Sequence, residues 1–281
     1  MSALLQPFQF EFFRNGTLAA IMVGGLCGLL GVYIVLRGMS YIGHGLSHAI
    51  FGGAVVAFVM TWNFYIGAGL WGFLAAVLIN QTTRRTKIGA DAAIGVITTA
   101  SFAIGVALIS RYRRFTRSFD AALFGNILGV STQDVLVVAG VTAMVLVIVF
   151  FLYKQLLFTT FDAEVAHIYG VKTEWVDTFF SLILAAALIA SMQILGVTLI
   201  AAALVIPAIS ARLLTDSFHR MTVLSSLIGA VTGFLGMYLS YYVDIASGAT
   251  IVLLQAAVFG VVLTVTSMQR RAARRLVHAH L

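Results

Sequence analysis

Two histidines one helical turn apart are the residues of this sequence best suited to chemistry. His44 and His48 stand in the segment YIGHGLSHAIFGG, and their spacing puts both imidazoles on the same face of a helix. Imidazole suits zinc, iron, copper or nickel better than calcium or magnesium. The pair predicts part of a transition-metal site. The alternative is a pair of core histidines, each satisfied by hydrogen bonds to neighbouring helices.

Two imidazoles do not complete a metal site, because a closed tetrahedral zinc site takes four ligands. Asp91 in KIGADAAIGV is a weaker candidate, since an acidic residue at the start of a helix more often complements the helix dipole. The single cysteine, Cys27, lies in an apolar run, which excludes a disulfide and a cysteine-based site. A two-fold dimer would supply His44 and His48 twice and so provide four imidazoles around one pathway.

The sequence carries no signature of an ATPase or a hydrolase. The P-loop pattern G-x-x-x-x-G-K-[ST] is absent, and none of the lysines follows a glycine-rich loop. The patterns G-x-S-x-G and H-E-x-x-H are absent as well. The chain therefore cannot be its own P-loop ATPase.

The elements that must position the histidines are membrane spans. Of the 281 residues, 61% are hydrophobic and 10% are charged, and the mean hydropathy of +1.04 excludes a water-soluble enzyme. A helix needs about 20 mostly apolar residues to cross a bilayer. We expect an all-α, polytopic membrane bundle of nine helices, or eight if a short run interrupted by glycine is re-entrant. The runs are 17–37, 44–61, 66–81, 91–110, 134–153, 175–194, 196–214, 221–242 and 248–268.

Three segments follow from this pattern. Residues 1–16 are rich in phenylalanine but too polar to span, which predicts an interfacial segment. Residues 17–268 form the transmembrane domain, and residues 269–281 form a basic tail. Gly24 with Gly28, and Gly229 with Gly233, have the small-xxx-small spacing that lets membrane helices pack closely.

The basic residues predict the orientation. The net charge is +7, and placing the tail in the cytoplasm leaves twelve of the 17 basic residues inside and five outside. Four outside residues sit in one loop: Arg111, Arg113, Arg114 and Arg117. A topology that flips between the fourth and fifth spans would bring this cluster inside. Nucleic-acid binding is the weaker explanation of the basic excess.

The segment FDAEVAHIYGV, residues 161–171, predicts a short amphipathic helix between the fifth and sixth spans, closed by Gly170. Its polar residues Asp162, Glu164 and His167 do not share one helical face, which argues against a metal site. Two interpretations are open on the residues alone, a solvated surface helix and a helix that docks a partner.

Six stretches, in order between about residues 17 and 265, resemble the permease subunits of ABC importers for manganese, zinc and iron. Singly each match is weak, but six in order are specific. The stretches are RGMSYIGHGLSHAIFGGAVVAF, TKIGADAAIGVI, LFGNILGVS, FDAEVAHIYGV, GVTLIAAALVIPAISARLL and SYYVDIASGATIVL.

The resemblance implies an assembly in a prokaryotic plasma membrane. Two permease protomers, identical or closely similar, would join two cytoplasmic ATPase subunits and an extracytoplasmic metal-binding protein. The permease would be a transport subunit and not an enzyme, with no permanent cofactor. Its cargo would be zinc, manganese or iron, ATP would bind the partner subunit, and lipid rather than nucleic acid would surround it.

The resemblance also assigns roles to residues. Segment 161–171 resembles the cytoplasmic coupling helix that contacts the ATPase, through Phe161, Asp162, Glu164, His167 and Gly170. The family's metal site maps onto His44 and His48. His48 matches the usual motif, whereas relatives commonly carry Asp at the first position, and His44 therefore favours zinc over manganese.

With that topology, the outside arginine cluster is expected to dock acidic residues of the binding protein. The expected mechanism is alternating access, in which the ion passes to a transient His44/His48 site while ATP-driven closure is transmitted through residues 161–171. A secondary transporter or channel is the alternative, but acidic relays inside the spans and inverted repeats are missing. A membrane scaffold would explain the packing glycines and not the two histidines.

Overall fold

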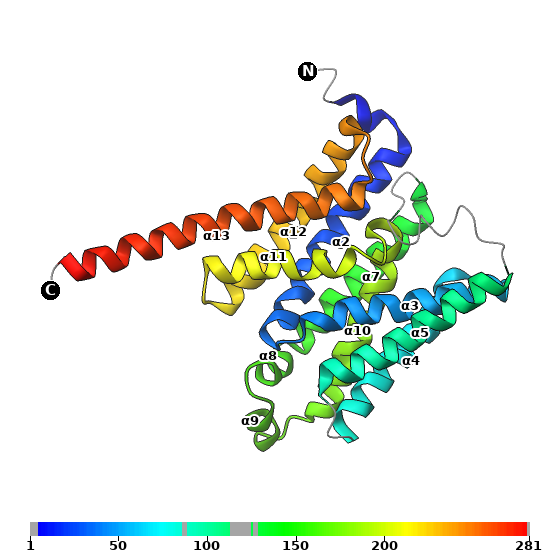
Figure 1. Ribbon diagram of the computed structural model, residues 1–281, viewed down its shortest axis with the longest axis horizontal. Coiled ribbons are helices and arrows are strands. Elements are labelled where there is room, and N and C mark those ends of the chain that lie inside the picture. Colours follow the sequence, from blue (N-terminus) through cyan, green and yellow to red (C-terminus); the bar gives the residue numbers. More distant parts are fainter. Residues whose placement is uncertain (1–4, 86–88, 113–124, 126–128, 280–281) are drawn as a thin grey trace.

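The computed structural model describes residues 5–85, 89–112, 125 and 129–279, and within these ranges the chain is helical without any strand. The helices are η1 (Gln6–Gln9), α2 (Glu11–Leu36), α3 (Ser40–Val59), α4 (Phe64–Arg85), α5 (Ala90–Tyr112), α7 (Thr132–Phe151), α8 (Tyr153–Phe161), α9 (Ala163–Ile168), α10 (Thr173–Leu195), α11 (Ile200–Leu214), α12 (Phe218–Val243) and α13 (Ser247–Ala279). Figure 1 shows them as a bundle with α8 and α9 at the end opposite the N-terminus.

Eight of the helices are long and apolar enough to cross a membrane: α2, α3, α4, α5, α7, α10, α12 and α13. The predicted helical membrane bundle is thereby confirmed. The short helix, however, is not one of the two runs that glycines interrupt. Runs 44–61 and 66–81 belong to full-length helices, whereas run 196–214 contains only the 15-residue α11. Gly196, with a φ of +77°, ends α10, and the turn that follows it delays the next helix to Ile200, so only Ile200–Leu214 are helical before α12.

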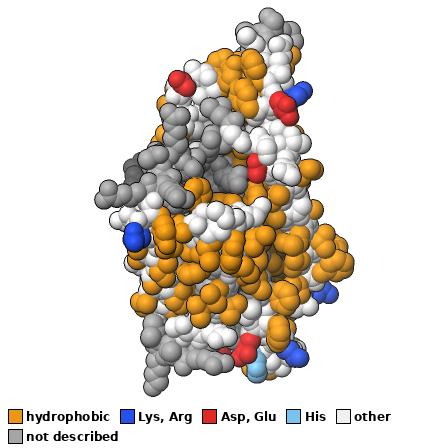
Figure 2. Space-filling model, turned by 90° about the vertical axis from the view of Figure 1, so that its right-hand side faces the viewer, with side chains coloured by type: hydrophobic (Ala, Val, Ile, Leu, Met, Phe, Trp, Pro, Cys, Tyr) orange, Lys and Arg blue, Asp and Glu red, His pale blue; other side chains and the backbone are white. Residues whose placement is uncertain are grey.

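The surface agrees with a membrane location. In Figure 2, hydrophobic side chains cover the middle of one face as a belt, and most of the charged side chains on that face lie above or below it. Such a belt is what the hydrocarbon core requires of the helices that contact it.

The predicted small-xxx-small spacings form one seam between α2 and α12, which lie side by side in Figure 1. A methyl group on Gly24 would overlap the carbonyl of Gly229, and a methyl group on Gly229 would overlap that of Gly24. Four residues further along α2, Gly28 meets Ser225, whose hydroxyl donates to the Gly28 carbonyl oxygen at 2.6 Å. Backbone contact replaces side-chain packing along this seam.

The core extends to the start of α2. This helix begins at Glu11, six residues before the apolar run, and Phe13 is fully buried against Phe8 and Tyr241. Cys27 in the same helix is also buried. Residues 11–16 are therefore helical, while the assignment of residues 1–16 to an interfacial segment stays a prediction.

Helix α3, which carries the two histidines, packs between α4 and α5. Gly52 contacts the carbonyl of Ser101 in α5, and Gly53 contacts Trp71 in α4. Neither glycine has room for a methyl group without a shift of its neighbour. The middle of α3 is therefore fixed against both helices.

The predicted short helix in segment 161–171 is present as α9. The Asp162 carboxylate accepts from the Val165 amide at 2.9 Å and caps its start. Gly170 follows its end with a φ of +81°, and its amide donates to the His167 carbonyl at 3.0 Å. Ile168 and Tyr169, at the end of this helix and directly after it, are about four-fifths exposed, so the described residues leave these apolar side chains uncovered.

Candidate metal-binding site

His44 and His48 face each other across one turn of α3. Their Nε2 atoms lie 3.2 Å apart, and the ring planes are 82° apart with centroids separated by 4.5 Å. Both side chains are half-buried. Two nitrogens that bind one tetrahedral zinc ion at about 2.0–2.1 Å would lie about 3.3 Å apart. The observed separation is therefore close to that of two ligands of a single ion.

The ring of His48 has little else to bind. Its Nδ1 atom is buried without a hydrogen-bond partner in the described part of the chain. Its other neighbour is Phe102 of α5, whose ring edge packs against it at 4.9 Å between centroids. For His48, the interpretation as a core histidine satisfied by other helices therefore finds no support among the described residues.

The backbone around the pair is held by Ser47. Its hydroxyl lies 2.8 Å from the His44 carbonyl oxygen and 3.1 Å from the Val197 carbonyl oxygen and donates to both. Val197 belongs to the turn between α10 and α11, directly after Gly196. The histidine helix is thus tied to the point where the sixth and seventh apolar runs separate.

Within one protomer, the described residues bring no third ligand to the pair, because they include no cluster of three His, Cys, Asp or Glu side chains that could hold a metal. Asp91 is exposed in the first turn of α5. This position suits a charge that complements the helix dipole.

The other predicted site residues lie apart from the histidines. Phe161, Asp162, Glu164 and His167 belong to the α8–α9 segment at the end of the molecule. Arg111 is exposed near the end of α5. Arg113, Arg114 and Arg117 lie outside the described residues.

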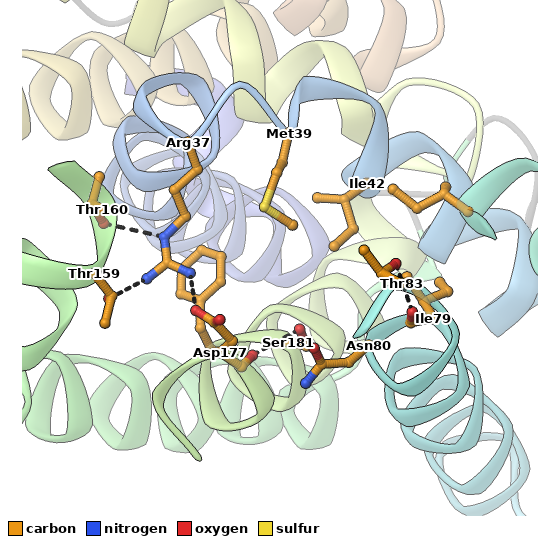
Figure 3. A pocket seen from close by; sticks show the side chains of 12 residues that line it. Arg37, Met39, Ile42, Ile79, Asn80, Thr83, Thr159, Thr160, Asp177 and Ser181 are labelled. Carbon is orange, nitrogen blue, oxygen red and sulfur yellow. Dashed lines mark hydrogen bonds and ion pairs between the residues drawn. The ribbon is translucent and has the colours of Figure 1, made fainter. Parts of the chain in front are cut away.

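A second polar cluster, which the sequence did not reveal, surrounds Arg37 at the end of α2. Its Nη1 atom lies 2.8 Å from Asp177 Oδ1 in α10. Nη2 donates to Thr159 at 2.9 Å and Nε donates to Thr160 at 3.1 Å, both in α8. The guanidinium also lies 4.6 Å from the ring centroid of Phe180. We call these residues the Arg37 cluster; they line a cavity of about 320 Å³ (Figure 3).

Burial is the main electrostatic influence on this cluster. It lowers the pKa of the Arg37 guanidinium from its ordinary value, while the Asp177 carboxylate opposes the shift. Arginine starts from so high a pKa that it stays charged. The only signal in the sequence is a lone basic residue at the end of the first apolar run, just before the histidine segment, and charge counting treats it as an orientation signal.

Comparison with known proteins covers nearly the whole chain. A sequence model of the ABC 3 transport family matches residues 9–266. "Manganese transport system membrane protein MntC" of Halalkalibacterium halodurans is 35% identical over 254 residues, 90% of this chain and 87% of that protein. "Probable iron transport system membrane protein" of Haemophilus influenzae is 34% identical over 259 residues, 92% of each. The structure of "PsaBC from Streptococcus pneumoniae in complex with Fab" has a TM-score of 0.84 at 34% identity and covers 93% of this chain and 94% of that one.

Proposed function

Because the chain belongs to the ABC 3 transport family, we propose that a divalent transition-metal ion crosses it by way of His44 and His48. The chain is the permease subunit of an ABC-type metal importer, a multi-pass protein of the prokaryotic plasma membrane. It is not an enzyme, and the ATPase is a separate subunit.

We propose manganese as the first candidate for the cargo and zinc as the second. The relatives described above are named for manganese or iron, and they match this chain along nine-tenths of its length. Two imidazoles, in contrast, favour zinc. The names carry more weight here, because an imidazole pair is an incomplete ligand set and its softness alone does not exclude manganese.

The single observation that carries the site is the pair of Nε2 atoms 3.2 Å apart, one of them on a ring whose other nitrogen is buried and has no hydrogen-bond partner among the described residues. We propose that two identical protomers bring two such pairs to a common axis, which provides four imidazoles. The ion would reside there only in passage. An open, half-buried pair suits transient binding, since a permanent structural site would be closed by its own chain.

We further propose that α9 docks the ATPase on the cytoplasmic side. The supporting observation is the exposure of Ile168 and Tyr169 on a short, capped helix, because apolar side chains at such a position are typical of a covered interface. The cycle would then be alternating access, with ATP-driven closure acting on α9 and opening the pathway below the histidines.

The binding protein is proposed to dock outside on the cluster of Arg111, Arg113, Arg114 and Arg117, where arginine can make paired contacts with carboxylates. Replacing all four by Glu should abolish uptake and leave the complex of permease and ATPase intact. Pull-down of the ATPase checks assembly, and normal uptake by that variant would contradict this docking surface.

The test of the function is uptake into proteoliposomes that contain the permease and its ATPase, with loaded binding protein outside. We expect ATP-dependent uptake of radioactive manganese that zinc or iron reduces and calcium does not. The order of competition ranks the candidate metals. Equal uptake with a non-hydrolysable ATP analogue would replace the proposal with an ATPase-independent transporter.

A further inference from the structure

The Arg37 cluster is more completely bonded than any role in orientation requires. The side chain of Arg37 is only 7% exposed, and each of its three nitrogens has a partner. A charge placed only to set topology would lie in water, because burial of a guanidinium is costly unless its nitrogens have partners. The position of these partners therefore needs a separate explanation.

The partners of Arg37 lie on both sides of α9 in the chain. Thr159 and Thr160 occupy the last turn of α8, immediately before α9. Asp177 lies in the second turn of α10, which begins shortly after α9. One guanidinium thus joins the segments that enter and leave the proposed ATPase-docking helix, as Figure 3 shows for its bonds to α8 and α10.

The backbone of Arg37 leads directly into the histidine helix. Gly38, with a φ of +67°, closes α2, and the Met39 amide donates to the Ile34 carbonyl at 3.0 Å. Helix α3 begins at Ser40, so His44 follows one turn later. This connection is a hydrogen-bonded turn rather than a slack loop, and a displacement of Arg37 is therefore passed to the first turn of α3.

The first turn of α3 has space on one side. Met39 and Ile42 line one wall of the 320 Å³ cavity, and Ile79, Asn80 and Thr83 of α4 line another (Figure 3). Further along, Gly52 and Gly53 hold α3 in close contact with α5 and α4. The cavity therefore leaves space beside the start of α3, where Gly43 and Gly45 are in close contact with Leu204 and Ile94, for a tilt that keeps the middle of the helix in place.

We infer that Arg37 is a positioning residue that couples movement of α9 to the histidine-bearing end of α3. The inference rests on the proposed function, in which an ATPase acts on α9 and the ion passes His44 and His48. When α8 and α10 move with α9, the guanidinium moves with them, and the turn at Gly38 tilts the start of α3. Arg37 itself touches no cargo.

A purely structural role for the cluster makes a different prediction. An anchor that only holds the bundle together would, when weakened, reduce the amount of assembled complex and leave each assembled complex as efficient as before. A coupling residue would, when weakened, let ATP be hydrolysed with less metal imported. The number of metal ions imported per ATP hydrolysed therefore separates the two roles.

The decisive variant is Thr159→Val with Thr160→Val. It removes both hydroxyl partners of Arg37 and keeps the ion pair with Asp177 and nearly the same side-chain volume. In the proteoliposome assay, we expect the ratio of manganese imported to ATP hydrolysed to fall about threefold or more, within the range reported for residues of coupling networks. The matched control is Thr222→Val, whose hydroxyl donates only within α12, and its ratio should stay at the wild-type value.

A second variant covers the case in which the double variant fails to assemble. Arg37→Lys keeps the charge opposite Asp177 but lacks the fork that reaches both threonines, so its ratio should fall as well. A wild-type ratio in whichever of the two variants assembles would overturn the inference. Failure of the proposed function looks different, because wild-type proteoliposomes would then show no ATP-dependent uptake at all.

Discussion

Arg37 and His44 lie seven residues apart in the chain, yet the Arg37 cluster and the histidine pair are bonded in opposite ways. Among the described residues, the buried Nδ1 of His48 has no hydrogen-bond partner, whereas each nitrogen of the Arg37 guanidinium has one. A polar group left open inside a membrane protein is costly and is suited to binding something that comes and goes. A guanidinium bonded at each of its three nitrogens is suited to holding helices together. The difference supports the proposals of cargo contact for the histidine pair and of coupling for Arg37.

The largest effect that this comparison predicts is on uptake by His48→Ala. Loss of one ligand from each protomer should reduce manganese uptake by about 100-fold or more, beyond the range seen when only outer partners of a metal site are removed. Expression and assembly should change little, because the ring makes no hydrogen bond outside the pair within the part of the chain that the structure describes. His219→Ala, at an exposed position in α12, is the control. Uptake at the wild-type level by His48→Ala would remove the site assignment.

The order of the two variants should be reversed for thermal stability, which Arg37→Ala should lower more than His48→Ala does. The substitution leaves the Asp177 carboxylate without its cation and both threonines without their donor, at a cost of about 2 kcal/mol. The melting temperature of the purified permease in detergent should therefore fall clearly for Arg37→Ala and hardly at all for His48→Ala. Equal melting temperatures for the two variants would contradict the proposed difference between the histidine pair and the Arg37 cluster.

A smaller effect is expected from pH. Imidazole must be deprotonated to bind a metal, so the affinity of the permease for manganese should weaken as the pH falls from about 7.5 to about 5.5. Arg37 stays charged across this range, so its ion pair should be unaffected. Isothermal titration of the detergent-solubilised permease measures the affinity, and the melting temperature over the same range is the control. An affinity independent of pH would argue against imidazole ligands.

The smallest predicted effect is that of Ser47→Ala. The change removes the hydroxyl that holds the Val197 carbonyl but leaves both histidine rings in place. The free energy of unfolding should fall by about 1 kcal/mol, and metal uptake should fall only a few-fold. A loss of uptake as large as that expected for His48→Ala would show that the turn after Gly196 is as important to the site as the imidazoles.

Local sequence patterns predicted most of the fold. Of the two polar features, they predicted the histidine pair and not the Arg37 cluster. Apolar run length located the spans, and four-residue spacing predicted both the glycine seam and the common face of His44 and His48. Each of these features depends on residues within one or two helical turns. The metal-ligand role itself stays a prediction.

Other features depend on contacts that no local pattern contains. Arg37 and Asp177 are separated by 140 positions in the chain, and the local sequence around each residue does not predict their pairing. The brevity of α11 depends on the positive φ of Gly196, in a stretch where composition alone reads as two adjacent spans. Long-range side-chain pairing and local backbone conformation could therefore not be predicted from the sequence.

The burial of Cys27 has a practical consequence for following this permease in motion. The native thiol is 1% exposed, so maleimide reagents will reach it slowly in the folded protein. A cysteine introduced at an exposed position such as Tyr41 in α3 or Tyr169 beside α9 can thus be labelled selectively without first removing the native one. A fluorophore or spin label at each position would give a direct distance between the two ends of the proposed linkage during turnover.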